Sequence, residues 1–320
     1  MRRRVDLWLL GAALAASFAS GVAGLWVSER HAGLVVWGHD AAGLAVIALA
    51  WPKLGVIRRG LRRRWPHVGG SLAAAACVAG LLGFGVAHSA GVHDVGPLTA
   101  LGWHIAFALG LAPLVVQHLT TRPVRLRRGD LTRAAFLRLA AFTGAGVVAK
   151  LAFDRTLGAG RTATGSLEQA RPAPTVWFED STPPIDPGTW RVDVGGRRLG
   201  PADLARLPQR EWTCTLDCTS GWYARNRWRG VRLVDLPLAL PPGTGSVEVR
   251  SATGYARRFD LASLPGLMLA THLDGVPLDP GNGAPVRLVA SGRRGFWWVK
   301  WVTSVQPSAR PPWWQSPFPL

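Results

Sequence analysis

The sequence predicts a chain of two parts: an N-terminal all-α transmembrane bundle of about five helices, and a C-terminal α+β domain that is rich in β-strands. Of the 320 residues 48% are hydrophobic and only 18% are charged, which is unusual for a soluble chain. The apolar runs lie in the first half, and most acids and prolines lie in the second. We expect the bundle over residues 1–153, a linker over 154–174, the domain over 175–310 and an aromatic, proline-rich tail over 311–320.

Four apolar runs are each close to the ~20 residues that a helix needs to cross a bilayer. They are residues 7–27, 33–51, 68–90 and 98–119. A fifth run, residues 134–153, is weaker because it contains Arg138 and Lys150. Both lie near its ends, where long side chains can reach the lipid headgroups. The sequence therefore predicts a multi-pass protein whose first partner is the lipid bilayer.

The net charge of +18 raises the possibility of nucleic-acid binding, but its distribution argues against it. The basic residues of the first half cluster at residues 2–4, 53–64 and 122–133, between the apolar runs. This is typical of cytoplasmic loops, and it places the N-terminus in the cytoplasm. Five spans then make the C-terminal domain extracytoplasmic at the plasma membrane, whereas four would leave it inside. Residues 132–138 resemble a twin-arginine export signal with Ala134 in place of one arginine; an ordinary basic helix start is the alternative.

Histidines within the apolar runs suggest a haem b, because imidazole inside a membrane is costly unless it has a function. His39 and His104 lie at similar expected depths and form the first candidate pair. His118 is a weaker candidate, with His67 as its expected partner near the inner surface, and His88, nearer the outer surface, is another. The alternative is that such histidines lie at the membrane interface and bond lipid headgroups or loop carbonyls.

The second half shows the alternation that is typical of short strands. Strands are expected over residues 190–194, 246–251, 285–290 and 296–302. Short helices are expected at 201–207, after Gly-Pro, and at 261–264, after Asp260 as the N-cap. About 150 residues suffice for one compact α+β core.

The stretch Trp212-Thr-Cys214-Thr-Leu-Asp-Cys218-Thr-Ser-Gly-Trp222 predicts a strand through Cys214 and leaves three interpretations of its cysteines. A Cys214–Cys218 disulfide requires the strand to break, since four extended residues span ~13 Å against a limit of ~7 Å between bridged Cα atoms. A zinc site needs about four ligands, and no other Cys or His lies close in the sequence. The third interpretation is one thiolate bound to a soft transition metal. Cys214 is then read as a core residue.

Several motifs in order resemble the molybdopterin-binding domain of the sulfite oxidase family. Cys218-Thr-Ser-Gly-Trp222, followed by Trp228-Arg-Gly-Val-Arg-Leu-Val-Asp-Leu236, is similar to the stretch around that family's molybdenum-ligating cysteine. Leu269-Ala-Thr-His-Leu-Asp-Gly-Val-Pro-Leu278 resembles a downstream element. Residues 282–301, Asn-Gly-Ala-Pro-Val-Arg-Leu onward, resemble the pterin-binding end. The resemblance covers about residues 182–306.

The resemblance implies a molybdopterin cofactor and a role for each matched residue. Cys218 becomes the thiolate ligand of molybdenum, and Arg287 and Lys300 contact the pterin phosphate or ring system. Gly292 and Gly295 let the backbone approach the cofactor. Asn282, with the next glycine, stands where the family often has a His-Gly pair, so its pterin contact departs from the pattern.

Both halves together predict a membrane-anchored molybdopterin-dependent oxidoreductase that performs oxo-transfer on a small, sulfite- or sulfoxide-like substrate. A haem in the bundle would exchange the electrons with the quinone pool or another carrier. Two alternatives stay open: a tethered, non-redox binding domain of the same fold, and the same enzyme with a haem-free anchor. A set of arginines either lines an anion-attracting pocket or is simply surface: Arg225, Arg227, Arg257 and Arg258.

Overall fold

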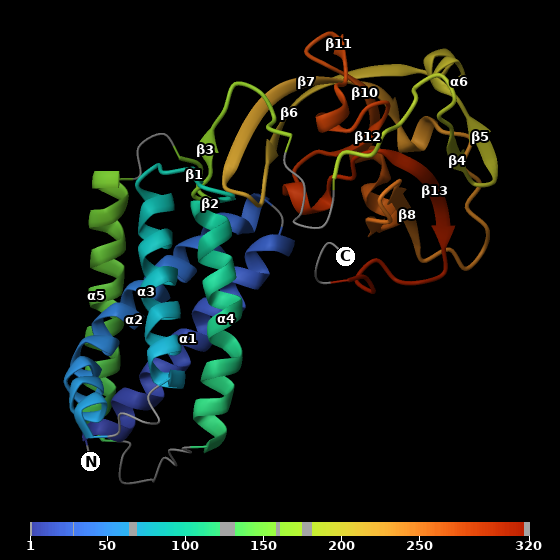
Figure 1. Ribbon diagram of the computed structural model, residues 1–320. Coiled ribbons are helices and arrows are strands. Elements are labelled where there is room, and N and C mark those ends of the chain that lie inside the picture. Colours follow the sequence, from blue (N-terminus) through green and yellow to red (C-terminus); the bar gives the residue numbers. More distant parts are fainter. Residues whose placement is uncertain are drawn as a thin grey trace. The chain divides into compact units, whose positions relative to one another are not determined.

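The computed structural model of the chain describes residues 2–27, 29–63, 69–121, 132–157, 161–174 and 181–316. It divides into two compact units (Figure 1). One comprises residues 1–25 and 31–167, and the other comprises residues 168–320 with the short segment 26–30.

The first unit is a helical bundle, as the sequence predicts. Its helices are α1 (Arg2–Trp26), α2 (Glu29–Arg63), α3 (Gly69–Ser89), α4 (Ala100–Thr121) and α5 (Arg133–Leu157). A short hairpin, β1 (Asp94–Val95) and β2 (Leu98–Thr99), joins α3 to α4, and these two helices run side by side in Figure 1. Within the described residues, four stretches are long and apolar enough to cross a membrane: Val5–Trp26, Arg30–Ala50, Gly69–Ser89 and Ala100–Thr121.

The bundle carries its apolar side chains on the outside. Leu34, Val116 and Val148 are 77%, 60% and 66% exposed, while the buried cluster in the interior is small and centres on Leu10 and Val46. In water this arrangement would leave large apolar areas solvated. In a bilayer the same side chains lie in hydrocarbon, so the surface supports a membrane location.

An ion-paired lysine ties α5 to α2. Lys150 Nζ lies 2.9 Å from Asp40 Oδ2 on α2 and also contacts Asp154 Oδ1 one turn along α5. The Lys150 side chain is only 10% exposed. An unpaired cation at this depth would be costly, and two carboxylates offset that cost. The charge that makes the fifth run look weak in sequence is therefore paired inside the bundle.

Replacing Lys150 by Met tests this pairing. The variant leaves Asp40 without its counter-charge, and we expect the bundle to lose about 3 kcal/mol of stability, because breaking a buried pair strands a charge. The measurement is thermal unfolding in detergent. Asp154→Asn is the matched control: it keeps the Lys150–Asp40 pair and should cost clearly less. Equal unfolding temperatures for both variants and the wild type would refute the pairing.

The second unit contains two sheets and short helices. The six-stranded sheet contains β3 (Leu167–Glu168), β6 (Gln209–Asp217), β7 (Trp222–Arg232), β10 (Leu267–Leu273), β11 (Val276–Pro277) and β12 (Arg287–Ala290). The five-stranded sheet has the order β5 (Arg197–Leu199), β4 (Val192–Val194), β13 (Val302–Ser308), β8 (Ser246–Ser251) and β9 (Ala256–Phe259). The helical elements are α6 (Pro201–Arg206) and four 3-10 turns, η3 (Leu233–Asp235), η4 (Leu261–Gly266), η5 (Pro280–Asn282) and η6 (Gly295–Trp297).

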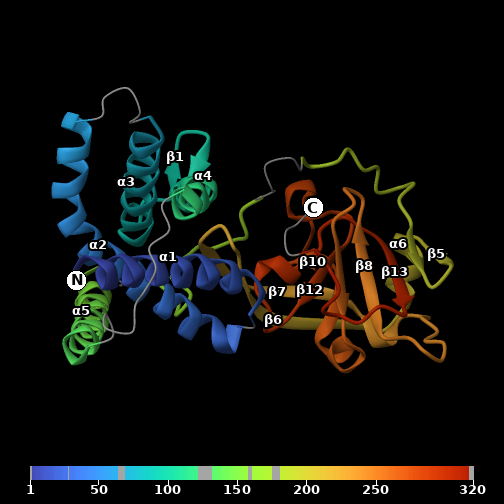
Figure 2. The ribbon, with the colours of Figure 1, turned by 90° about the horizontal axis from the view of Figure 1, so that it is seen from below.

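Strand β10 organises the first sheet, because it pairs antiparallel with both β7 and β12. Ala270 lies opposite Gly230 on one side and opposite Arg287 on the other. In the second sheet β13 pairs parallel with β4 and antiparallel with β8, and Figure 2 shows β8 and β13 side by side. A continuous core that includes Trp222, Trp228 and Val302 lies between these elements. The unit is thus α+β and rich in β-strands, as the sequence predicts.

Most local predictions for this unit are confirmed, with two corrections. Strand β8 covers residues 246–251, and α6 begins at Pro201. The predicted helix at 261–264 is a 3-10 turn, with Asp260 Oδ1 accepting from Ser263 N over 2.7 Å as its N-cap. The predicted strand at 296–302 is wrong. The 3-10 turn η6 occupies 295–297, and Trp301 has φ = 50°, so that the strand begins only at Val302.

Candidate active site

Cys218 occupies the turn between β6 and β7. Its N–H donates to Trp222 O over 2.8 Å, and its carbonyl accepts from Gly221 N over 3.1 Å. Its Sγ lies 3.1 Å from Ser220 Oγ. Strand β6 passes through Cys214, as the sequence predicts, and ends at Asp217, so the thiol is fixed by a four-residue turn at one end of the sheet.

The structure separates Cys218 from Cys214. No disulfide joins them, and Cys214 lies within β6, paired with Asn226 of β7 and packed against the core. Among the residues that the structure describes, no group of three His, Cys, Asp or Glu side chains could hold a metal ion. The described residues thus give no support to the disulfide or the zinc interpretation.

A second turn packs directly on Cys218. A Cβ added to Gly295 would lie 3.0 Å from Cys218 Cα and 3.2 Å from Asp217 O, closer than ordinary carbon contacts allow. Gly295 is therefore the residue that lets residues 292–297 approach the thiol-bearing turn. Gly292 has a different reason for being glycine: its φ is 74°, and there is open space where its Cβ would be.

A buried ion pair joins these two turns. Arg294 Nη2 donates to Asp217 Oδ1 over 3.3 Å, and the two side chains are 8% and 4% exposed. Asp217 precedes Cys218, and Arg294 precedes Gly295. The sequence analysis missed this pair, and its one signal was that each residue neighbours a candidate site residue.

Arg287 on β12 is a buried cation with no carboxylate partner among the described residues. Arg287 is 2% exposed. Its Nη1 donates to Asn282 O over 3.1 Å, and its Nε has no hydrogen-bond partner among the described residues. The guanidinium carbon lies 5.0 Å and 5.3 Å from the ring centroids of Trp228 and Trp298. Burial lowers the pKa of Arg287 to about 10, and the nearby Cys218 thiol opposes this shift. The site therefore favours an anion.

Lys300 contacts the stretch of backbone, residues 281–283, to which Asn282 belongs. Lys300 Nζ donates to Gly281 O over 2.6 Å, and Asn282 Nδ2 donates to Asp279 Oδ2 over 2.9 Å. The buried Asn282 Oδ1 has no hydrogen-bond partner. Gly283 has φ = 102°, and an added Cβ would lie 3.0 Å from Arg287 Cβ and 3.1 Å from Lys300 Cβ. The structure thus places Asn282, Arg287 and Lys300 around one stretch of backbone and Gly295 against Cys218, whereas no contact joins Gly292 to them.

The other arginines fall into different environments. Arg225 and Arg227 are exposed on β7, and Arg258 pairs with Glu248. Arg257 is 1% exposed, with its guanidinium carbon 4.2 Å from the Tyr255 ring centroid and 3.8 Å from that of Phe296. Burial raises the pKa of Tyr255 to about 12, so its hydroxyl stays protonated and donates to Phe296 O. Of this set, only Arg257 is a buried cation.

In the bundle, His39 on α2 and His104 on α4 face one another. Their ring centroids are 5.9 Å apart, with an interplanar angle of 77°. His39 Nδ1 lies 2.8 Å from Ser17 O, and His104 Nδ1 lies 2.7 Å from Leu81 O. A carbonyl can only accept, so each Nδ1 carries the proton and each Nε2 keeps its lone pair. Imidazole–metal bonds of about 2 Å would put two rings on one metal about 6 Å apart, which matches.

The weaker histidine candidates are not brought together. His88 lies one residue before the end of α3 and His118 lies three residues before the end of α4. Because α3 and α4 are joined by a hairpin, these two positions are at opposite ends of the pair of helices. His67, the expected partner of His118, lies outside the described residues.

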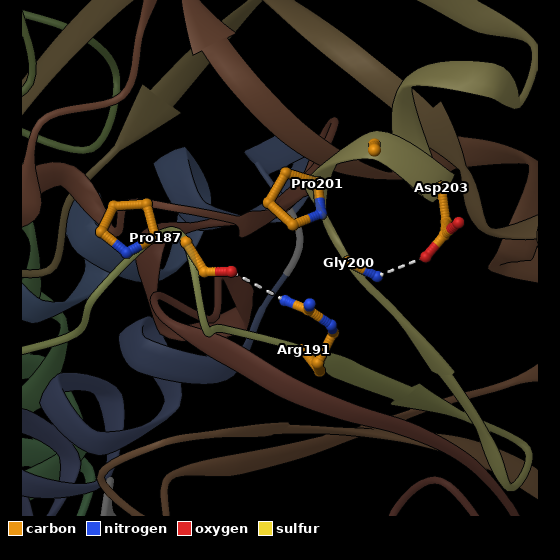
Figure 3. A pocket seen from close by; sticks show the side chains of 7 residues that line it. Pro187, Arg191, Gly200, Pro201 and Asp203 are labelled. Carbon is orange, nitrogen blue, oxygen red and sulfur yellow. Dashed lines mark hydrogen bonds between the residues drawn. The ribbon is translucent and has the colours of Figure 1, made fainter.

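A shallow depression of about 470 Å³ lies elsewhere in the second unit (Figure 3). Its polar groups already bond the surrounding backbone: Arg191 Nη1 donates to Gly188 O over 3.0 Å, and Asp203 Oδ2 accepts from Gly200 N over 2.9 Å. It contains none of the predicted site residues. We assign it no function.

Residues 179–314 match the family model described as the oxidoreductase molybdopterin binding domain. This part of the chain therefore carries a molybdopterin-binding domain that is similar to those of the sulfite oxidase type. Mitochondrial sulfite oxidase of Macaca fascicularis is 29% identical over 174 residues, which are 42% of this chain and 32% of that protein. The catalytic subunit MsrP of the protein-methionine-sulfoxide reductase of Xanthomonas axonopodis pv. citri is 31% identical over 142 residues, 37% of this chain and 44% of that protein.

The chain spans less than half the length of these curated relatives. Among solved structures, the sulfane dehydrogenase SoxCD from Paracoccus pantotrophus matches with a TM-score of 0.38 and 22% identity, covering 40% of each chain.

Gly283→Ala tests the close packing around Arg287 and Lys300. The new methyl group meets two side chains and an unfavourable φ, so we expect a loss of about 3 kcal/mol together with a loss of bound molybdenum. Unfolding midpoints and metal content are the measurements. Gly254→Ala is the control, since Gly254 has φ = 91° with open space where its Cβ would be, and should cost about 1 kcal/mol. A larger loss of stability in the control than in Gly283→Ala would contradict the close packing of Gly283 against Arg287 and Lys300.

Proposed function

We propose that the chain is a membrane-anchored, molybdopterin-dependent oxidoreductase that transfers an oxygen atom to or from a small substrate such as sulfite or a sulfoxide. The observation that carries the proposal is the buried Arg287, a cation that forms no ion pair among the described residues and lies close to the thiol of Cys218. The two named relatives, a sulfite oxidase and a methionine-sulfoxide reductase, motivate the two substrate classes.

The residues of the site fit a pterin cofactor. Cys218 would ligate molybdenum through its thiolate, a soft ligand for a soft metal. Arg287 and Lys300 would hold anionic groups of the cofactor, and Arg287 Nε is a buried donor without a partner. Asn282 Oδ1 is a buried acceptor without a partner, suited to an N–H group of a pterin ring. Gly292 and Gly295 would keep the backbone at this side free of side chains. Bound molybdopterin would supply the two-electron oxo-transfer chemistry.

For the bundle, we propose that His39 and His104 hold a haem b that exchanges electrons with quinone or another carrier. The facing rings and the protonated Nδ1 atoms support this, because both leave Nε2 available as a ligand. Glycines make room for the rings: a Cβ on Gly85 would lie 2.9 Å from His104 Nδ1, and one on Gly21 would lie 3.3 Å from His39 Cε1. His118 and His88 remain weaker candidates.

We further propose that the bundle lies in the plasma membrane and that the C-terminal domain is extracytoplasmic. The apolar exterior of the bundle and the pairing of Lys150 within it support five spans. Labelling of the domain in intact cells by a membrane-impermeant reagent tests the orientation, and labelling only after lysis would reverse it.

Two rival functions stay distinguishable. A tethered, non-redox binding domain needs no thiolate. The presence of Cys218 close to Arg287, which itself lies beside Lys300, favours the enzyme over this alternative. An enzyme with a haem-free anchor needs no facing histidines, and the 5.9 Å separation favours the haem.

The metal content of Cys218→Ala tests the first part. With the thiolate removed, we expect purified protein to lose its stoichiometric molybdenum and its oxo-transfer activity. Cys214→Ser is the matched control, because Cys214 lies on the neighbouring stretch of β6 and should keep the metal. Full molybdenum and full activity in Cys218→Ala would favour the non-redox rival.

Reduced-minus-oxidised absorption tests the haem. We expect a b-type band in the wild type that is lost in both His39→Ala and His104→Ala, since each removes one axial ligand. His93→Ala, which changes a histidine in the loop between α3 and α4 that contacts Asp94, is the control and should keep the band. If the wild type from a haem-supplying host shows no such band, the bundle is an anchor only.

A further inference from the structure

A histidine at one end of the bundle has a buried nitrogen that forms no hydrogen bond. His93 lies between α3 and α4, and its Nε2 is buried with no partner among the residues that the structure describes. Its Nδ1 lies 2.9 Å from Asp94 Oδ1. A carboxylate can only accept, so Nδ1 of the neutral ring carries the proton and Nε2 keeps its lone pair. A buried acceptor that stays unsatisfied costs free energy, and a donor on a ligand would remove that cost.

His93 is held close to His104, one of the two histidines proposed to hold haem. Ala100, the first residue of α4, donates its N–H to His93 O over 2.7 Å. His104 follows four residues later, and four residues of α-helix advance by ~6 Å. The backbone of His93 is therefore only about one helical turn along α4 from His104.

Aromatic and apolar side chains surround this end of α3 and α4. Trp103 Nε1 donates to Val95 O over 2.8 Å, which ties the indole ring to the hairpin. Phe84 stacks on Trp103, with ring centroids 5.8 Å apart and an interplanar angle of 21°. Val86 and Val92 are 48% and 43% exposed. A ligand at this place would meet flat rings, which favour a planar aromatic group, and exposed apolar side chains, which favour an alkyl tail.

We propose that His93 Nε2 accepts a hydrogen bond from the hydroxyl group of a membrane-soluble quinol, with Asp94 holding the imidazole ring in the tautomer that this requires. The His93 side chain is 24% exposed, so part of the ring is open to an incoming ligand. A quinol combines a donor hydroxyl, a planar aromatic ring and an apolar tail. The oxidised quinone has carbonyl groups, which only accept, so the Nε2 lone pair selects the reduced form. The inference rests on the proposed function and deepens it, because it names the electron carrier of the bundle.

Anaerobic titration calorimetry of the full chain in detergent, with a decyl-substituted benzoquinol as the ligand, tests the site. The protein is first reduced with dithionite, so that no electrons are transferred and the heat reports binding alone. We expect His93→Phe, which keeps a planar ring and removes the acceptor, to weaken binding about tenfold, the effect of one lost hydrogen bond. The matched control is His272→Phe on β10, which makes the same change in the C-terminal domain and should leave the dissociation constant unchanged.

The dimethyl ether of the same quinol tests the hydrogen bond from the side of the ligand. The ether can only accept, so it should bind the wild type about tenfold more weakly than the quinol and should not respond to His93→Phe. Asp94→Ala, which frees the tautomer, should weaken quinol binding less than His93→Phe does. His93→Gln guards against loss of folding, because its side-chain oxygen also accepts and should keep the affinity close to that of the wild type.

Equal quinol affinities in the wild type and in His93→Phe would overturn the proposal, and so would an ether that binds the wild type as tightly as the quinol. A wild type that lacks the b-type band would instead overturn the proposed haem. Recording the absorption spectrum before each titration separates these two failures.

Discussion

The close contact between Gly295 and Cys218 is the constraint on which the outer site depends. The two residues are far apart in the sequence, and the sheet brings their segments together because β10 pairs with β7 on one side and with β12 on the other. Neighbouring strands lie about 4.8 Å apart, so Arg287 on β12 is two strand spacings from β7. From there its long side chain reaches the ring of Trp228. Residues 292–297, which follow β12, then pack against the turn that carries the thiol.

Buried cations give this site its chemical character. A guanidinium taken out of water without a carboxylate is unstable unless an anion joins it. Arg294 has Asp217, whereas Arg287 forms no ion pair among the described residues: it bonds a carbonyl, lies beside two aromatic rings, and feels the Asp279 carboxylate without contacting it. The difference separates two roles within one site. Arg294 is balanced within the protein, and Arg287 is left to be balanced by whatever binds, which an anionic pterin cofactor can do.

Most helices and strands were predictable from the sequence because their signals are local. The features that the sequence did not predict depend on contacts between distant segments. Long apolar runs and alternating strands are local signals, so the helices and strand β8 were recovered. The segment 296–302 has the composition of a strand, but contacts from distant segments bend it: Trp301 Nε1 donates to Pro280 O over 2.8 Å and Tyr255 donates to Phe296 O. The Asp217–Arg294 pair was missed because 77 residues separate its members. No periodicity within either segment reports on such a contact.

The membrane half follows the same rule, with lipid in place of water. An imidazole or an ammonium group in hydrocarbon needs a partner, and here each has one: His39 and His104 bond backbone carbonyls, and Lys150 bonds carboxylates. The lysine and the histidines differ in whether their polar groups are already bonded within the bundle. Lys150 is fully compensated by Asp40 and Asp154, which suits a role in holding α5 to α2. Each histidine bonds a carbonyl through Nδ1, and the two rings lie 5.9 Å apart. Nε2 is therefore the nitrogen through which each ring would bind the haem that we propose.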